Sequence, residues 1–175
     1  MNSRALTVIL VLTALTACKP PPTDASMDRG APQAKPPRAS APLPSPETEG
    51  ALWTVSAQNS GRIIYGVPGS PALIALTCLA ESAPPLVQIT RFSPADEGAG
   101  ALLALVGNGH IGRIEVDATE IEGKSIWQGE VLAADTRLEP LAGPRQLTAT
   151  IPGAGMVTLN PSPLPMELIS TCRES

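Results

Sequence analysis

The chain has 175 residues, a net charge of −4, 20 prolines and 15 glycines, but only four aromatic residues. An acidic chain without clusters of Lys or Arg does not fit a protein that binds nucleic acid or adheres to an anionic membrane surface. Residues 51–175 hold seven Lys or Arg and twelve Asp or Glu, a net charge of −5. They are long enough for one domain, whose core must be built from Leu, Ile, Val and Ala.

The chain begins with a short apolar run that ends at a cysteine. Arg4 precedes about ten apolar residues, the length of a signal-peptide core and too short to span a bilayer. The run closes on Leu15-Thr16-Ala17-Cys18, which resembles the lipobox of bacterial lipoproteins. The resemblance implies that residues 1–17 are a signal peptide cleaved between Ala17 and Cys18, and that acyl chains on Cys18 anchor the protein in a lipid bilayer. An ordinary secretory signal with a coincidental cysteine is the alternative.

Residues 18–50 follow as a proline-rich segment. From Lys19 to Gly50, nine of 32 residues are proline, and there is neither an aromatic residue nor an apolar periodicity. Such a composition predicts a disordered, extended tether behind the lipidated N-terminus. In the lipoprotein family an Asp after the cysteine tends to mark inner-membrane retention. Lys19 therefore favours the outer membrane of a bacterial cell envelope, with the domain in the periplasm.

Short stretches of alternating apolar and polar residues recur along residues 51–175. Examples are 86–91, 114–119 and 146–151, and Gly- and Pro-rich segments separate them. This spacing predicts an antiparallel β-sandwich or small barrel with about seven to nine strands between Leu52 and Leu159. Residues 135–142 begin with an Asp cap and residues 165–172 with a proline, so both are expected to form short helices.

Two cysteines remain once Cys18 is assigned to lipid. Cys78 and Cys172 form an even pair in an oxidising compartment, which predicts a disulfide that pins the C-terminal segment to the core. Buried free thiols or a metal pair are the alternatives. The stretches "WTV…IIYGVPGSPALIALTC" and "PSPLPMELISTCR" resemble small, uncharacterised envelope lipoproteins of Gram-negative bacteria, which carry one cysteine after an early strand and another in a closing "CR" segment. That resemblance implies no activity.

Residues 107–112, "GNGHIG", have the GxGxxG spacing of a dinucleotide-binding turn. The β-branched alternation after them predicts a strand instead of the helix that a pyrophosphate requires, so we expect a hairpin turn with Asn-Gly at its tip. His110 is the single histidine and would have to carry any Ser-His-Asp type of catalysis, with Glu115 or Asp117 orienting it. A solvent-facing turn residue is the simpler interpretation.

Asp117, Glu120 and Glu122 form an acidic cluster, and Glu130 and Asp135 follow. Paired carboxylates can hydrolyse glycosides or bind calcium. Their spacing fits no EF-hand loop, and a sugar cleft would require more aromatic residues, so a solvated strand face is expected.

Trp53 and Trp127 are expected to pack in the core or at its rim, with an exposed interface anchor as the alternative. Together the patterns predict a non-catalytic binding or structural module that docks another envelope protein, without a cofactor or a metal. An inhibitor of a hydrolase of the protease or lysozyme type is the alternative, with "SPADEGAG" at residues 93–100 as its inserting loop. A His110-dependent enzyme is the third hypothesis.

Overall fold

Nine strands follow one another along residues 52–159 of the computed structural model, which describes residues 41–175. The predicted signal peptide, the lipidation of Cys18 and residues 18–40 of the tether lie outside the described residues. The strands are β1 (Leu52–Val55), β2 (Arg62–Gly66), β3 (Ile74–Leu79), β4 (Leu86–Pro94), β5 (Gly100–Gly107), β6 (His110–Ile121), β7 (Lys124–Leu132), β8 (Leu147–Thr150) and β9 (Met156–Leu159). Two short helices accompany them, the 3₁₀ helix η2 (Thr136–Leu141) and the α-helix α1 (Leu164–Arg173).

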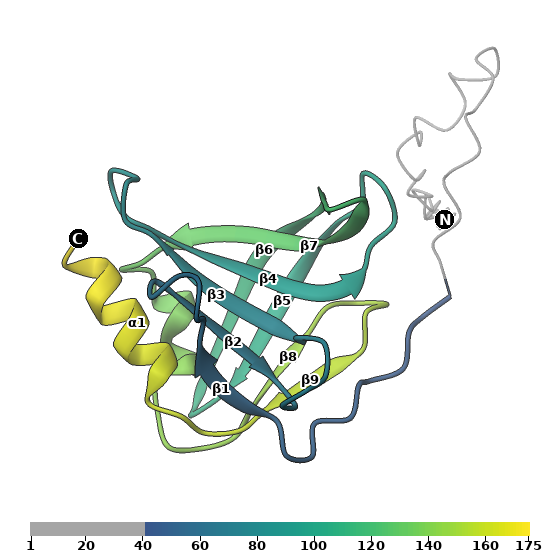
Figure 1. The fold of residues 1–175 in the computed structure, drawn as a ribbon, viewed down its shortest axis with the longest axis horizontal. Helices are drawn as coiled ribbons and strands as arrows, with labels where there is room; N and C mark the ends of the chain where they lie inside the picture. The colour runs from purple at the N-terminus through teal and green to yellow at the C-terminus, as the bar shows by residue number, and fades with distance from the viewer. Residues whose placement is uncertain (1–40) are drawn as a thin grey trace, which may run out of the picture. The chain divides into compact units, whose positions relative to one another are not determined.

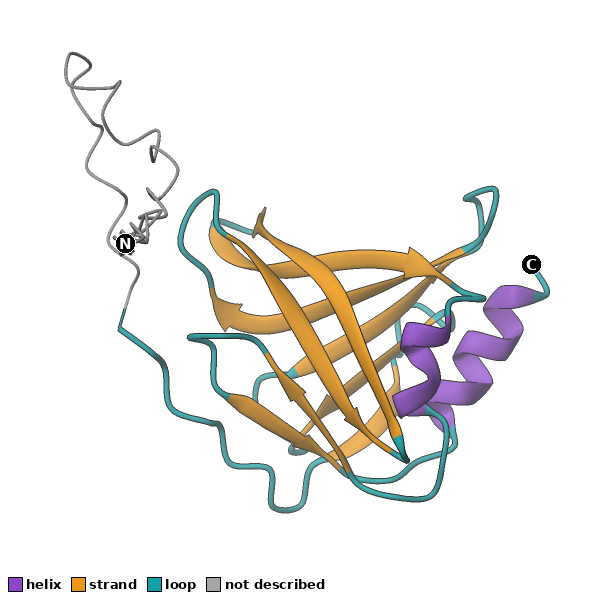
Figure 2. Cartoon of the chain, turned by 180° about the vertical axis from the view of Figure 1, so that it is seen from behind, coloured by secondary structure: helices purple, strands orange, loops and turns teal. Residues whose placement is uncertain are grey.

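All nine strands belong to one antiparallel sheet with the order β1-β2-β3-β4-β7-β6-β5-β8-β9. The sheet curls until its two edge strands approach each other, which gives a nearly closed barrel (Figures 1 and 2). The predicted mainly β fold is therefore confirmed, and of the two architectures considered the barrel is the one observed. Both predicted helices are present, although the first is a 3₁₀ helix with Pro140 inside it.

Inward-facing residues alternate with outward-facing ones and fill the barrel. Trp53 and Tyr65 are the aromatic part of this core, with ring centroids 5.1 Å apart, and Trp127 is also buried. The predicted core packing of both tryptophans is therefore confirmed. The other large, fully buried side chains are aliphatic, as the composition predicted: Ile74, Leu76, Val87, Ile89, Leu103, Leu105, Ile114, Leu138, Ile151, Leu159 and Ile169.

Side-chain hydrogen bonds close the seam between the edge strands β1 and β9. Tyr65 is fully buried, and its hydroxyl donates to the carbonyl oxygen of Thr158 (2.9 Å) and accepts from the backbone N–H of Asn160 (3.1 Å). The Asn160 side-chain amide donates to the carbonyl oxygen of Ala51 (2.8 Å). These bonds give partners to backbone N–H and C=O groups beside the seam, where β1 and β9 form no ladder of backbone hydrogen bonds with each other. Burial raises the pKa of the Tyr65 phenol.

The barrel has two different ends. The end that carries α1, η2 and the turns at 56–61, 80–85 and 108–109 is called the helical end below (Figure 1). The opposite end carries the loops at 67–73, 95–99, 122–123 and 151–155 and is called the arm end, because residues 41–46 lie there as an extended arm.

The arm is bonded to the barrel. The backbone N–H of Leu43 donates to the carbonyl oxygen of Gly153 (2.8 Å), and the Ser45 hydroxyl accepts from the N–H of Met156 (3.0 Å). Gly155 has φ of +71° and lies so close to the Pro44 carbonyl that a Cβ would clash with it. Residues 43–45, which the composition assigned to the tether, therefore pack against the barrel, ahead of the domain start predicted at residue 51.

A buried arginine ties the loops of the arm end together. Arg91 is 5% exposed, and its guanidinium donates to the carbonyl oxygens of Leu73 (3.1 Å), Phe92 (3.4 Å) and Ala154 (3.2 Å). No carboxylate of the described residues forms an ion pair with it, and burial lowers the Arg91 pKa to about 10.

Asp135 caps η2. Its carboxylate accepts from the backbone N–H of Arg137 (2.8 Å) and from the Arg137 guanidinium (2.8–3.1 Å), and these bonds hold the pKa of Asp135 below its ordinary value. Because the pKa is lower in the folded chain, the stabilisation is present above the ordinary carboxyl pKa and is lost as pH falls through the lowered value. We expect Asp135→Ala to lower the free energy of unfolding by about 1 kcal/mol near pH 7. Urea titrations near pH 7 and near pH 3 should show the difference shrinking in acid, and a difference that is equal at both pH values would contradict this assignment.

Candidate functional site

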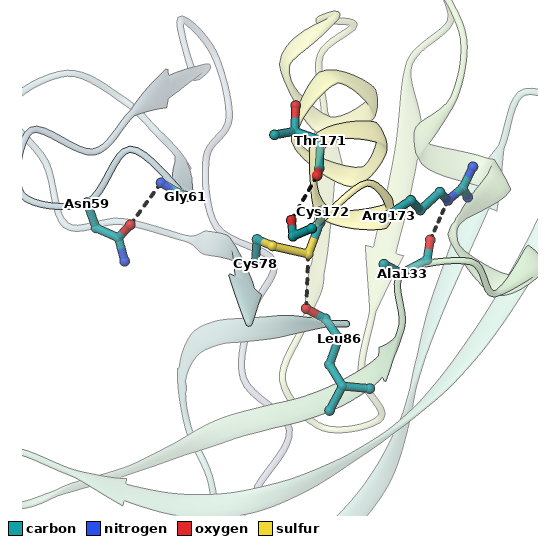
Figure 3. The surroundings of a disulfide bond; sticks show 9 residues. Asn59, Gly61, Cys78, Leu86, Ala133, Thr171, Cys172 and Arg173 are labelled. Carbon is teal, nitrogen blue, oxygen red and sulfur yellow. Dashed lines mark hydrogen bonds between the residues drawn. A yellow bond between two sulfur atoms is a disulfide. The ribbon is translucent and has the colours of Figure 1, made fainter. Parts of the chain in front are cut away.

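The disulfide between Cys78 and Cys172 fixes helix α1 against the barrel. The sulfur atoms are 2.06 Å apart and join β3 to the last turn of α1 across 94 residues of sequence (Figure 3). Cys172 is fully buried, its sulfur lies 3.3 Å from the carbonyl oxygen of Leu86, and the neighbouring Arg173 Nε donates to the carbonyl oxygen of Ala133 (2.6 Å). The predicted disulfide is confirmed, and it pins the helix over the ends of β3 and β4.

A groove of about 720 Å³ runs between α1 and the strands that it covers. Apolar side chains make its floor: Val55 of β1, Ile63 of β2, Leu79 of β3, and Leu164 and Leu168 of α1. Val55 is 52% exposed, so part of this apolar lining is open to solvent. Cys78 also borders the groove, so the disulfide that positions α1 sets the groove's width.

The rim of the groove is polar and carries only negative charge. Glu81 from the β3–β4 loop and Glu167 from α1 line it, and none of its lining residues is Lys, Arg or His. The Asn59 side chain accepts from the N–H of Gly61 (2.8 Å), which fixes the turn that forms one wall (Figure 3). An apolar floor with an acidic rim suits an apolar side chain flanked by positive charge. Apart from the cysteine pair, no pattern in the sequence indicated this groove, because its walls come from segments about a hundred residues apart.

The glycine-rich motif forms the predicted hairpin turn. Asn108 and Gly109 have φ of 52° and 85°, the left-handed pair that a tight hairpin between β5 and β6 requires. A Cβ on Gly112 would clash with the carbonyl of Arg137, so this glycine lets η2 lie against β6. The Asn108 side chain bonds Pro140 (2.9 Å) and Arg145 (3.0 Å), which clamps the hairpin to the segment after η2.

His110 does not meet the carboxylates that the sequence suggested. Its side chain is 50% exposed at the hairpin, and Nδ1 lies 3.0 Å from Oε2 of Glu139 on η2. Glu115 and Asp117 are five and seven residues along the same strand, about 17 Å and about 24 Å away at the rise of an extended chain. The assignment of Glu115 or Asp117 as the orienting carboxylate was therefore wrong, because residues that are close in a strand's sequence are far apart in space. The exposed turn position of His110 is confirmed.

The acidic residues do not assemble into a site. Asp117, Glu120, Glu122 and Glu130 are all exposed, as expected for a solvated face, whereas Asp135 caps η2. Within residues 41–175, no group of three or more His, Cys, Asp or Glu side chains is placed to hold a metal ion.

The loop proposed to insert into a hydrolase is held by backbone hydrogen bonds. Ala95 donates to the carbonyl oxygen of Ser125 (3.0 Å), and Ala118 donates to that of Ala99 (2.8 Å). Of the residues between, Glu97 and Gly98 are exposed. The loop separates two hollows of about 750 and 420 Å³, bordered by Ser93 and Trp127 respectively. The Ser93 hydroxyl and the Trp127 indole N–H have no hydrogen-bond partner among the described residues.

Comparison with protein-family models, with curated proteins and with solved structures found no match. Along residues 41–175, no helix has both the length and the apolar character needed to cross a membrane.

Proposed function

We propose that this protein is a non-catalytic binding module of the bacterial envelope, and that its groove beside α1 docks a segment of a partner protein. The observation that carries the proposal is the groove itself. Its lining is largely apolar, the disulfide holds α1 as one of its walls, and the charged side chains that line it are all acidic. A partner segment with an apolar side chain between Lys or Arg residues fits this chemistry. The net charge of −5 on residues 51–175 supports a basic protein partner and disfavours nucleic acid.

The lipobox resemblance supports an anchor at Cys18, and Lys19 supports the outer membrane with the domain in the periplasm. The described chain enters the barrel at the arm end, whereas the groove lies at the helical end (Figure 1). The described chain therefore joins the barrel at the end opposite the groove.

The test is capture of partners from the native membrane in mild detergent, with mass spectrometry as the readout. We expect the full chain to retain one near-stoichiometric envelope protein, and Cys18→Ser to lose it because the domain is no longer held at the membrane. Glu81→Lys/Glu167→Lys reverses the charge of the rim and should reduce capture at least tenfold, since like charges across an interface repel.

Glu120→Lys/Glu130→Lys is the matched control, because both glutamates are exposed on strands away from the groove. It changes the net charge by the same amount and should capture normally. Equal loss of partner capture in both double variants would indicate a general effect of net charge. If capture survives the charge reversal at Glu81 and Glu167, the partner does not bind in the groove.

A hydrolase inhibitor remains the second candidate. The pinned loop at 95–99, with its exposed Glu97–Gly98 tip, favours it, because a rigid loop loses little conformational freedom on binding. Recovery of a protease or lysozyme in the capture experiment, insensitive to the rim variant, would favour this candidate.

A further inference from the structure

The two edges of the sheet differ in what covers them. At the edge strand β9 the arm supplies a partner, because the Ser45 hydroxyl accepts from the backbone N–H of Met156 (3.0 Å). The other edge strand, β1, pairs only with β2 in the described part of the chain. Many proteins protect such an edge with a charged residue, a proline or a bulge. The sequence of β1, Leu-Trp-Thr-Val, has none of these, so its free edge can accept another strand.

The register of β1 on β2 shows which backbone groups point to this free edge. The N–H of Ser56 donates to the carbonyl oxygen of Arg62 (2.9 Å), so these two opposite residues form a hydrogen-bonded pair. Hydrogen-bonded and non-bonded pairs alternate along an antiparallel ladder. Thr54 therefore also bonds β2, whereas the N–H and C=O groups of Trp53 and Val55 point away from it.

These groups point to the side on which α1 begins. Ala51 alternates in step with Trp53 and Val55, and its carbonyl oxygen accepts from the side-chain amide of Asn160 (2.8 Å), shortly before α1. Within residues 41–175, no hydrogen bond reaches the backbone of Val55 from this side. Val55 and Leu164, the first residue of α1, both line the groove. The unpaired backbone of β1 therefore opens onto the groove at Val55.

We propose that the partner segment binds at the groove as an added β-strand, paired through its backbone with the free edge of β1. This inference rests on the proposed function and adds the conformation of the partner segment. In this mode of recognition, backbone hydrogen bonds to the edge supply affinity and alternate side chains enter pockets. A residue opposite Val55 places its side chain on the same face as Val55, and so against the apolar lining of the groove.

The charged residues of the groove set the sequence pattern of the added strand. Residues two positions apart in a strand share a face. The neighbours of the apolar residue that also face the groove are therefore two positions away on either side. Glu81 and Glu167 favour Lys or Arg at those positions, which gives the pattern Lys/Arg-x-apolar-x-Lys/Arg. The β1 strand of a second copy does not fit this pattern, because it contains neither Lys nor Arg.

The test uses a synthetic peptide as the probe, acetyl-Thr-Lys-Thr-Leu-Thr-Lys-Thr-amide, with the full chain carrying Cys18→Ser. Threonine favours an extended backbone, and the leucine lies between two lysines at the expected spacing. We expect isothermal titration calorimetry to show binding. Replacing both lysines of the probe with glutamate should weaken binding at least about tenfold, because the groove is acidic. A lysine probe that does not bind at millimolar concentration overturns the proposal.

N-methylation of the probe separates backbone pairing from side-chain docking. A methyl group on the leucine nitrogen removes the N–H that faces β1 in an antiparallel pair, whereas a methyl group on the neighbouring threonine nitrogen lies on the opposite edge. We expect the first to weaken binding at least about tenfold and the second to change it less than about twofold. The reverse order would support an added strand that runs parallel to β1. Equal binding of the two methylated probes overturns the proposal.

Hydrogen exchange measured by NMR tests the edge of the protein. In the free chain the N–H of Val55 should exchange faster than that of Thr54, and the probe should protect it. Val55→Pro removes this N–H, keeps an apolar side chain and breaks no bond to β2. It should keep the urea midpoint of the parent and bind the probe about fivefold more weakly. A Val55 N–H that is already protected in the free chain overturns the proposal, because the edge is then occupied.

Failure of this inference and failure of the proposed function give different results. If Glu81→Lys/Glu167→Lys loses the native partner but the two methylated probes bind alike, the groove docks its partner through side chains and the added strand is overturned. If that double variant captures the native partner normally, the proposed function fails, whatever the probes show.

Discussion

Removing the disulfide with Cys78→Ala/Cys172→Ala lowers the free energy of unfolding by about 4 kcal/mol. The cross-link closes a loop of 94 residues, and in the chain-entropy model a loop of that size restricts the unfolded chain by about 4–5 kcal/mol. The folded chain also loses the attachment that seats α1 over β3. Urea denaturation of both proteins in a Cys18→Ser background gives the difference directly, because that background leaves no third thiol to mispair.

Reduction of the parent chain is the control for this prediction. A thiol reductant should lower the urea midpoint of the parent chain to that of Cys78→Ala/Cys172→Ala. It should leave the urea midpoint of this double variant unchanged. A loss below about 1 kcal/mol would show that packing of α1, with Ile169 and Leu168 buried beneath it, is enough to hold the helix without the cross-link. Under the proposed function, reduction also frees one wall of the groove and should abolish capture of the partner.

Tyr65→Phe is expected to lower the free energy of unfolding by about 3 kcal/mol, the second largest effect. The substitution keeps the ring against Trp53 but removes the hydroxyl that bonds the Thr158 carbonyl and the Asn160 N–H. Each buried backbone group left without a partner costs about 1–3 kcal/mol. Since these bonds cross the seam between β1 and β9, hydrogen exchange should also accelerate in β9.

Thr54→Val is the matched control for Tyr65→Phe. It removes a hydroxyl from the edge strand β1, but Thr54 is exposed and its bond to the Ile64 carbonyl is long, at 3.4 Å. We expect a change below about 0.5 kcal/mol. A double-mutant cycle of Tyr65→Phe with Asn160→Ala should show coupling, because both side chains close the same seam, and strictly additive effects would contradict that description.

Local patterns in the sequence were sufficient for several elements. Alternation of apolar residues marked the strands, Asn108-Gly109 marked a hairpin, and an even cysteine pair marked the cross-link. Each of these signals depends on a few neighbouring residues or on residue type alone. Such local patterns marked the exposed turn position of His110 but not the carboxylate beside it, because Glu139 is brought near by η2 packing on Gly112, a contact that no spacing in the sequence reveals.

The sequence by itself therefore determined the β-rich class, the turn at 108–109 and the disulfide of this protein, because conformational preference and thiol chemistry are local properties. Only the tertiary structure decided that the sheet closes into a barrel, since the hydrogen bonds of Tyr65 across the seam join residues more than 90 positions apart in the sequence. It also decided where the groove lies. The groove is assembled from α1 and from strands distant from it in sequence, and strand order is set by the packing of the whole core.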